Sequence, residues 1–580
     1  MNQPTTYTAF TIGPIYKTLT QQRRTRSIFA ASYFLSYIMK QMLHELSAHE
    51  KDILIPSSKL LNQKTPGTGL FPDRLIMKGG NIELLNDARE KVFKDLIDKI
   101  QDLTWLHPDY LKSYLKIYTL ELEIPEDERT IHLINEYLDN LELQETFPSG
   151  EDSDALQRFF HLQADNFMTQ DAFGEDAGKS FKSLFEIATS EVAKSPDERA
   201  RRDYEELIDE YITAQAIEYK EKKLYRDLEN QPLDPDEDFL YENLQTIMEE
   251  DFRDYMKYIA IIYADGDRFG SHIKNLNGDA SKLQDFSSRL FVFNLQAKEL
   301  IENYGGAPVY IGGDDLLFFA PVANMLQVDD SRPKTLFHLI NQLDEAFHEA
   351  MGEKDAHGNL LPLSLSMSYG VSLSYHKYPM NEALKEAAEL LFSKAKDNHT
   401  HETRKVHPNK NVIAFKVLKH SGQFFEAIID KDPLDNAPRD PNDPTLYQHF
   451  MGLLDLDIKG ENFLNSLTHS MAFFQDLFVE LLVKSSNPDP QMIQNLFDNN
   501  LNEGIHNQNR AYINQVAAFV IKVFTDLRNK NLQNPLIFEP SSGNPEDRWE
   551  SLSEKGLGTI YATLRFIHFI RSKRNKNVYV

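Results

Sequence analysis

The sequence contains no cysteine, which excludes disulfide bonds and zinc sites built on thiolates. It also lacks an apolar run of the roughly 18 residues that a membrane-spanning helix needs, and its best run, Tyr258 to Ala264, has the length of a strand. The first residues, MNQPTTYTAFTIGP, contain no basic region followed by an apolar stretch, so we expect no secretory signal. These absences are typical of a cytoplasmic protein with no membrane contact and no zinc.

Basic residues are scarce relative to acidic ones. The chain has 62 Lys and Arg against 89 Asp and Glu, a net charge of −27. A protein that binds nucleic acid alone usually carries a basic excess that neutralises phosphates. We therefore expect any contact with RNA to be local or shared with a more basic partner. The basic cluster near the end of the chain is interpreted as a solvated tail (Arg571, Lys573, Arg574 and Lys576).

At 580 residues the chain is too long for one hydrophobic core, and about four domains are expected. Residues 1–145 are predicted to form an α+β unit with a long amphipathic helix over 15–46. Its short strands are expected at 8–14, 53–56, 74–77 and 114–124. Residues 146–252 are acidic and predicted to be helical, and 423–580 are predicted to be helical throughout.

The clearest pattern lies in residues 253–422. Helices are expected over 283–304, over the apolar stripe that begins at Leu336, and over 381–396. Strands are expected at 258–263, 308–311, 316–320, 363–374 and 412–417. This order is β-α-β-β-α-β with an added α-β, which is the ferredoxin-like palm arrangement.

Three aspartates lie at the ends of strands that this arrangement would bring close together. Asp265 follows the first palm strand, and Asp314 and Asp315 lie on the hairpin between the second and third strands. Carboxylates that converge repel one another and are tolerated mainly where a cation neutralises them. Oxygen ligands without His or Cys favour Mg²⁺ or Mn²⁺. The pattern predicts a metal-dependent nucleotidyl transfer site; the alternative is that Gly-Gly-Asp-Asp is only a polar β-turn.

Glycines and lysines complete this candidate site. Gly312 and Gly313 are expected to allow positive φ in the hairpin and to leave room for a triphosphate. Lys394, Lys396 and Lys410 flank the last helix and the last strand, where they would hold triphosphate charge or would simply form a solvated face.

Several segments together resemble one protein family. They are FTIGPIYKTLTQQRRTRSIFAASYFLSY at 10–37, FPDR at 71–74, ADGDRFG at 264–270, IGGDDLLFFAP at 311–321, SYGVSLSYHKYP at 368–379 and KNVIAFKVLKHSG at 410–422. With them the chain resembles the large, polymerase/cyclase-like subunit of type III-B (Cmr) CRISPR effector complexes.

The resemblance implies an α+β fold of two ferredoxin-like palm domains with two mainly helical domains. Only the second palm is implied to be catalytic, and the first has Gly79-Gly80-Asn81 without paired aspartates. The implied activity is synthesis of a nucleotide second messenger from ATP in antiviral defence, switched on by target RNA paired to guide RNA within the complex. The product is implied to be cyclic oligoadenylate, or AMP joined to S-adenosylmethionine. The implied nucleotide-binding residues are Gly266, Asp267, Gly312, Gly313, Lys396, Lys410 and Ser32.

Two departures from the family pattern matter. The palm signature begins at residue 10 and no His-Asp dipeptide occurs, so we expect no HD nuclease domain and no DNase activity. Many III-B relatives carry a cysteine zinc site, which this sequence cannot form.

Three other features of the sequence resemble functional sites. The segment 174–180 (GEDAGKS) has one residue too few for a P-loop and is interpreted as a connecting loop. The polar segment 398–408 contains three histidines, interpreted as a flexible loop rather than a zinc site: His399, His401 and His407. A basic cluster on the first helix either contacts guide RNA or a neighbouring subunit, or is solvated: Arg23, Arg24 and Arg26.

Two other functions stay open. One is a non-catalytic scaffold that organises guide RNA and neighbouring subunits; the intact carboxylates argue against it, because unused buried charge costs stability. The other is a free-standing cyclase, which would work without RNA.

Overall fold

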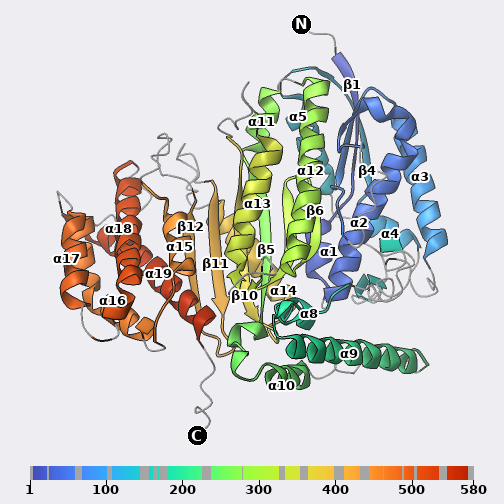
Figure 1. Cartoon of the computed structure of the whole chain (residues 1–580). Helices are drawn as coiled ribbons and strands as arrows, with labels where there is room; N and C mark the ends of the chain where they lie inside the picture. The colour runs from blue at the N-terminus through green and yellow to red at the C-terminus, as the bar shows by residue number, and fades with distance from the viewer. Residues whose placement is uncertain are drawn as a thin grey trace.

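In a computed structural model of the chain, two antiparallel-rich sheets lie side by side with helices around them (Figure 1). The structure describes residues 4–22, 25–58, 68–100, 108–127, 129–143, 156–157, 159–160, 168, 171–172, 181–224, 237–276, 278–325, 333–352, 364–396, 410–431, 443–460, 463–485, 489–501, 504, 506–533 and 545–572.

The first sheet has four strands in the order β2-β3-β1-β4, all neighbours antiparallel. They are β1 (Pro4–Thr11), β2 (Ile53–Ile55), β3 (Arg74–Lys78) and β4 (Tyr118–Pro125). Between β1 and β2 run α1 (Ile15–Thr20) and α2 (Thr25–Glu45), and α3 (Ile82–Lys99), α4 (Pro108–Tyr114) and α5 (Thr130–Glu142) complete the unit. This is the ferredoxin-like order predicted for the first palm.

Two details of the first palm differ from the prediction. The expected single helix over 15–46 is divided, because α1 ends at Thr20 and α2 begins at Thr25. The apolar pattern does not mark this break, since both helices bury apolar faces. The strand expected from Tyr114 begins only at Tyr118, because Tyr114 ends α4 and Lys116 between them has a φ of 42°.

The second sheet has six strands in the order β12-β11-β10-β5-β7-β6. The strands are β5 (Tyr258–Asp267), β6 (Ala307–Gly312), β7 (Asp315–Pro321), β10 (Ser366–Tyr375), β11 (Val412–Leu418) and β12 (Phe424–Asp430). Its first four strands in chain order are arranged as β10-β5-β7-β6, which matches the β4-β1-β3-β2 arrangement of the first sheet. The two sheets therefore share one core topology, as predicted for two palms.

Helices cover both faces of the second sheet. α12 (Ala280–Tyr304) and α13 (Leu336–Met351) pack together and contact β6, β7 and β10. α14 (Met380–Glu389) continues into a π-helix, η5 (Leu390–Ala395), and both contact β10. They approach closely because Gly370 of β10 has no side chain; a Cβ there would lie 2.3 Å from the carbonyl oxygen of Ala387.

The prediction that residues 423–580 are helical throughout is wrong at β12. The strand pairs antiparallel with β11 after a turn in which Gly422 has a φ of +79°. The remaining helices lie beyond the β12 side of the sheet (Figure 1): α15 (Leu446–Asp455), α16 (Phe463–Phe478), α17 (Pro490–Asn500), α18 (Arg510–Gln533) and α19 (Pro545–Arg571). The domain boundaries stay predictions, and the second sheet extends to Asp430.

The predicted acidic helical segment contributes α8 (Leu184–Ala188), α9 (Glu198–Leu224) and α10 (Glu237–Met248). α9 and α10 lie together at one end of the molecule (Figure 1), and α8 contacts β5 and β7. Within the described residues, no helix combines the length and apolar character that crossing a bilayer requires.

Candidate active site

The antiparallel pairing of β5 and β7 brings the predicted carboxylates together. Asp265 lies opposite Asp315 in the register of the two strands, and the amide of Gly266 donates a 3.1 Å hydrogen bond to the carbonyl oxygen of Asp314. β5 extends through Asp267, so Asp265 and Asp267 lie on the strand itself, not after it. The meeting of the two strand ends predicted from the palm order is confirmed.

The hairpin between β6 and β7 is a tight turn. Gly312 pairs with Asp315, which leaves Gly313 and Asp314 as the two central residues. Gly313 has a φ of +64°, and the nearest atom to a Cβ built there is 4.0 Å away, on Pro72. Glycine at the first central position is typical of type II′ hairpins.

Gly312 is a glycine for a different reason from the one predicted. It is not among the positive-φ residues, so the expected positive φ at Gly312 is wrong. A Cβ there would lie 2.5 Å from the hydroxyl oxygen of Tyr310, so the tyrosine ring occupies that space. Gly266 is constrained in the same way, because its Cβ would lie 2.8 Å from the Cβ of Asp314.

Burial and mutual repulsion make these carboxyl groups hard to ionise. Burial raises the pKa of Asp314 to about 7, and the neighbouring charge of Asp265 adds to the effect. The pKa of Asp315 lies well above its usual range for the same two reasons, with the charge of Asp314 as the largest source of repulsion. Burial also raises the pKa of Asp265, although Lys396 opposes the rise. The charge of Lys396 therefore offsets only part of the burial and repulsion that disfavour ionised carboxylates here.

Two of the predicted lysines lie at this cluster. The ammonium of Lys396 contacts the carboxylate of Asp265 and donates a 2.8 Å hydrogen bond to the carbonyl oxygen of Gly266. Burial and the charge of Lys396 lower the pKa of Lys410, which also interacts with Asp265 and Asp267. Lys394 does not join them, because it pairs with Glu426 of β12 at 2.7 Å. Of the three predicted lysines, Lys396 and Lys410 are thus the two that lie at the carboxylates.

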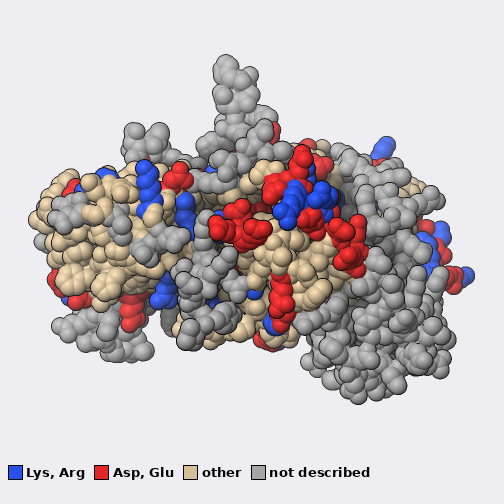
Figure 2. Space-filling view, turned by 60° about the horizontal axis from the view of Figure 1, so that its bottom comes forward, with Lys and Arg blue, Asp and Glu red and all other residues tan. Residues whose placement is uncertain are grey.

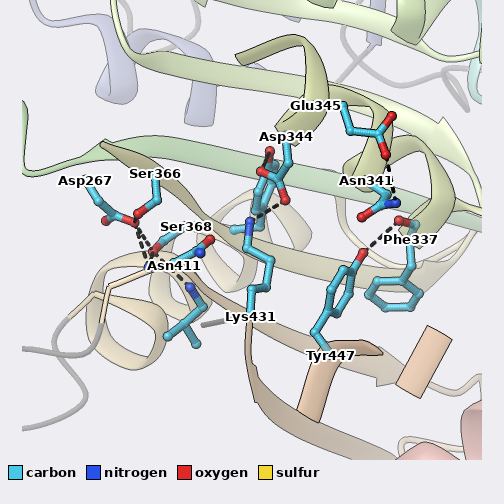
Figure 3. A network of polar contacts seen from close by, with 12 residues as sticks. Asp267, Phe337, Asn341, Asp344, Glu345, Ser366, Ser368, Asn411, Lys431 and Tyr447 are labelled. Atoms are coloured by element: carbon cyan, nitrogen blue, oxygen red, sulfur yellow. Dashed lines mark hydrogen bonds and ion pairs between the residues drawn. The ribbon is translucent and has the colours of Figure 1, made fainter. Parts of the chain in front are cut away.

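Asp267 is held in place from three sides (Figure 3). Its Oδ2 accepts hydrogen bonds from the hydroxyls of Ser366 and Ser368, at 2.9 and 2.8 Å, and from the amide of Asn411 at 2.8 Å. Asn411 has a φ of 67°, and its carbonyl accepts the amide of Lys431, whose ammonium pairs with Asp344 at 2.6 Å. The side chain of Asp267 is fully buried, and its Oδ1 has no hydrogen-bond partner. No local pattern indicates this anchoring role, since the serines lie in an ordinary strand pattern and Asn411 directly precedes a strand.

The first palm reaches the hairpin through residues 68–74. Gly69 forms a parallel bridge to Tyr310, and its carbonyl accepts a 2.8 Å hydrogen bond from the amide of Ile311. Ser36 of α2 fixes the same segment by accepting the amide of Phe71 at 2.8 Å. Asp73 follows; burial raises its pKa to about 6, and it interacts electrostatically with Asp314 and Asp315. Sequence reasoning missed Asp73, although it stands in the quoted FPDR motif.

Ser32 lies apart from the carboxylates, in the packing between the two palms. It is fully buried and its hydroxyl donates a 2.5 Å hydrogen bond to the carbonyl oxygen of Val309 in β6. Its predicted contact with nucleotide would require that bond to be exchanged.

These predicted features lie outside the described residues: 174–180, His399, His401, His407, Arg23, Arg24, Lys573, Arg574 and Lys576. Arg571 is described, and it donates to the carbonyl oxygens of Leu454 and Leu456 at 3.0 and 2.6 Å. That residue of the basic cluster therefore binds the protein itself.

The distribution of charged side chains over the surface is relevant to the expectation that any RNA contact is local (Figure 2). On the face that the figure shows, the described Lys and Arg side chains lie among Asp and Glu side chains and form no continuous basic band. The view agrees with the net charge of −27.

The donor set fits a hard divalent cation. Carboxylate oxygens, the carbonyl of Gly266 and Oδ1 of Asp267, which accepts no hydrogen bond, are oxygen donors of the kind that Mg²⁺ and Mn²⁺ prefer. In the part of the chain that the structure describes, no three His, Asp or Glu side chains are gathered as a ready metal site. The ammonium of Lys396 lies among these oxygens instead, in contact with Asp265 and the carbonyl of Gly266.

Two ferredoxin-like palms, one of which carries an aspartate hairpin, define a fold of the polymerase and nucleotidyl cyclase class. Residues 258–404 match the family described as Cas10/Cmr2, second palm domain, and residues 7–104 match CRISPR-associated protein Cmr2, N-terminal. These two matches support a Cmr2/Cas10 large subunit, as the sequence resemblance implied.

Three proteins that are similar to this chain are distant from it in sequence. The chain is 25% identical over 197 residues to the CRISPR system Cmr subunit Cmr2 of Pyrococcus furiosus, which is 30% of this chain but only 20% of that relative. It is similar in fold to a chain of the type III-B Cmr-beta complex bound to cognate target RNA, with a TM-score of 0.52, 12% identity, and coverage of 86% of this chain and 78% of that one. The apo state of Cmr-beta gives a TM-score of 0.52 and 11% identity, with 84% and 76% of the two chains covered. At these identities the likeness shows the fold alone.

Proposed function

We propose that this chain is the nucleotidyltransferase subunit of a type III CRISPR effector complex, activated by target RNA paired to guide RNA. It would use ATP and divalent metal to make a second messenger, either cyclic oligoadenylate or AMP joined to S-adenosylmethionine. The observation that carries the proposal is the pairing of Asp265 with Asp315 at the end of β5, with Asp314 beside them on the hairpin. A scaffold would gain nothing from burying these charges.

Asp265, Asp314 and Asp315 would hold the metal, together with the carbonyl of Gly266. A bound Mg²⁺ or Mn²⁺ would supply Lewis-acid stabilisation to a phosphoryl transfer. Asp267 would not bind the nucleotide directly through Oδ2, because this oxygen already accepts three hydrogen bonds from the protein. It would hold β5, β10 and the start of β11 in one arrangement and so orient Asp265.

The chain's own residues would bind the nucleotide around this cluster. The open space beside Gly313, where the nearest atom to an added Cβ is 4.0 Å away, would admit phosphate groups. Lys396 and Lys410 would neutralise phosphate charge. The first palm would hold the hairpin from the other side through the hydrogen bond between Gly69 and Ile311.

Chelation tests the metal dependence. The assembled complex with matching target RNA should make no nucleotide product in EDTA, and added Mn²⁺ or Mg²⁺ in excess should restore synthesis. Synthesis that persists in EDTA would rule out the metal mechanism.

We also propose that this chain does not cleave single-stranded DNA, since its sequence contains no His-Asp dipeptide. Labelled single-stranded DNA should remain intact with the activated complex. Metal-dependent cleavage that survives mutation of the partner subunits would show a nuclease site in this chain.

A further inference from the structure

The ammonium of Lys396 is surrounded by oxygens. It contacts the carboxylate of Asp265, donates to the carbonyl of Gly266 at 2.8 Å, and lies 3.8 Å from Oδ1 of Asp267. The lysine side chain is only 13% exposed, so little water reaches its ammonium to compete with these oxygens. These are oxygens of the same kind that bind a hard divalent cation.

The oxygens are fixed, whereas the lysine is not. Asp265 and Gly266 lie on β5 between two paired strands, and Asp267 accepts three hydrogen bonds. Lys396 reaches them from the end of η5, where its amide bonds to the carbonyl of Leu391 five residues earlier. A lysine side chain is a point charge on a flexible four-carbon stem, so it is the part of this arrangement that can move.

From this arrangement we infer that Lys396 is a resident cation that a divalent metal must displace. The inference rests on the proposed function, and it concerns how the site is loaded. A metal ion and an ammonium cannot share Asp265 and the Gly266 carbonyl, because two like charges would lie within contact distance. In the absence of nucleotide the lysine keeps metal affinity low.

A triphosphate changes this balance. Its phosphate oxygens can bind the ammonium of Lys396. Lys410, whose charge interacts with that of Lys396, can bind the same phosphate groups. If Lys396 moves from Asp265 to a phosphate group, the carboxylate of Asp265 becomes free to bind metal. Metal and nucleotide would therefore bind with positive coupling. By linkage, each would raise the affinity of the other by the same factor. The site would then load metal with its substrate and remain closed to metal alone.

Mn²⁺ binding tests this directly. The free Mn²⁺ signal in electron paramagnetic resonance would be titrated with the full chain, without nucleotide. Lys396→Met should bind Mn²⁺ roughly tenfold more tightly than the unchanged protein, within the usual range of coupling between sites. Lys394→Met is the matched control, because Lys394 lies two positions away and pairs with Glu426. It should bind Mn²⁺ as the unchanged protein does.

A second variant separates charge from folding. Lys396→Arg keeps the positive charge and should retain weak Mn²⁺ binding. Adenylyl-imidodiphosphate, a non-hydrolysable ATP analogue, should tighten Mn²⁺ binding to the unchanged protein more than to Lys396→Met. Mn²⁺ should also raise the melting temperature of Lys396→Met more than that of the other variants, which shows that the folded variant binds it.

Mn²⁺ binding by Lys396→Met that is equal to or weaker than that of the unchanged protein would overturn the displacement of Lys396 by metal. The proposed function would remain intact, since nucleotide synthesis does not require this displacement. Failure of every variant to bind Mn²⁺, even with the ATP analogue, would instead contradict the metal site itself and with it both proposals.

Discussion

The hydroxyl of Ser32 in the first palm donates a 2.5 Å hydrogen bond to the main-chain oxygen of Val309 in the second palm, 277 positions away in the chain. Next to it, the carbonyl of Gly69 accepts the amide of Ile311, one residue before the Gly-Gly-Asp-Asp turn. The first palm therefore continues the edge of the second sheet at β6. Although it lacks paired aspartates, it holds the strand that presents them.

Gly69→Ala should loosen this junction. A Cβ at position 69 would lie 2.9 Å from Oγ of Ser32 and 3.1 Å from its carbonyl oxygen, so the segment or α2 must shift. We expect a loss of about 1–3 kcal/mol in unfolding free energy, measured by denaturant titration. Gly270→Ala is the control, because nothing lies within 4 Å of its added Cβ and it is in α11 (Phe269–Asn275). Equal stability of the two variants would contradict the tight junction.

The double variant Asp314→Asn, Asp315→Asn should reduce nucleotide synthesis to background while the complex still assembles. Amides keep the shape of the carboxyl groups but remove the charge that a metal requires. Because burial and repulsion disfavour the ionised carboxyls, the free chain should melt at the same temperature or higher. Product formation and gel filtration of the complex measure these effects. Asp285→Asn, on the exposed side of α12, is the control.

Asn411 should tolerate glycine better than alanine. Its φ of 67° is easy for glycine and costs other residues about 1–2 kcal/mol. Asn411→Ala should therefore lower stability by about that amount and, through the amide that binds Asp267, reduce synthesis. Asn411→Gly should stay close to the unchanged protein in both measurements. Identical behaviour of the two variants would show that the left-handed conformation is unimportant.

Glu191 should make stability depend on pH near neutrality. Burial raises the pKa of Glu191 to about 7. The hydrogen bond from the Tyr255 hydroxyl and the charge of Arg253 oppose this rise, and the charge of Asp251 adds to it. The folded state therefore holds a proton that the unfolded state loses near pH 4.5. This contribution to stability is complete below about pH 4.5 and is lost as the pH rises toward 7.

Glu191→Gln should remove this dependence. The variant should be more stable than the unchanged protein above pH 7, by on the order of 1–3 kcal/mol, with the difference shrinking toward pH 5. Chemical denaturation at pH 5, 6, 7 and 8 measures it. A constant difference across this range would show that Glu191 does not titrate there.

Much of the second palm could be predicted because its sequence signals are local. The buried run that ends in Asp265, and the glycines between β6 and β7, indicate strands and a hairpin without reference to the rest of the chain. The strand order then places Asp265 near Asp315. β12 was missed, although Gly422 offers a turn between two apolar runs, because an edge strand is recognised mainly by its pairing with β11.

The roles of single residues were harder to predict. Gly312 is constrained by the ring of Tyr310, and Asp267 by serines about 100 positions later. Lys394 and Lys396 are equivalent in the sequence, yet the π-helical turn directs one to Glu426 and the other to Asp265. Such distinctions depend on tertiary contacts, which no local pattern records.

The most direct test of the account is mass spectrometry of the products. The assembled complex would be incubated with matching target RNA, Mg²⁺ and ATP, with and without S-adenosylmethionine, beside the Asp314→Asn, Asp315→Asn complex. The account predicts a nucleotide product that requires RNA and metal and is absent from the double variant. Cyclic adenylates from ATP alone would identify one messenger, and a conjugate that requires S-adenosylmethionine would identify the other. No product in either reaction, with target RNA bound, would contradict the account and favour a scaffold.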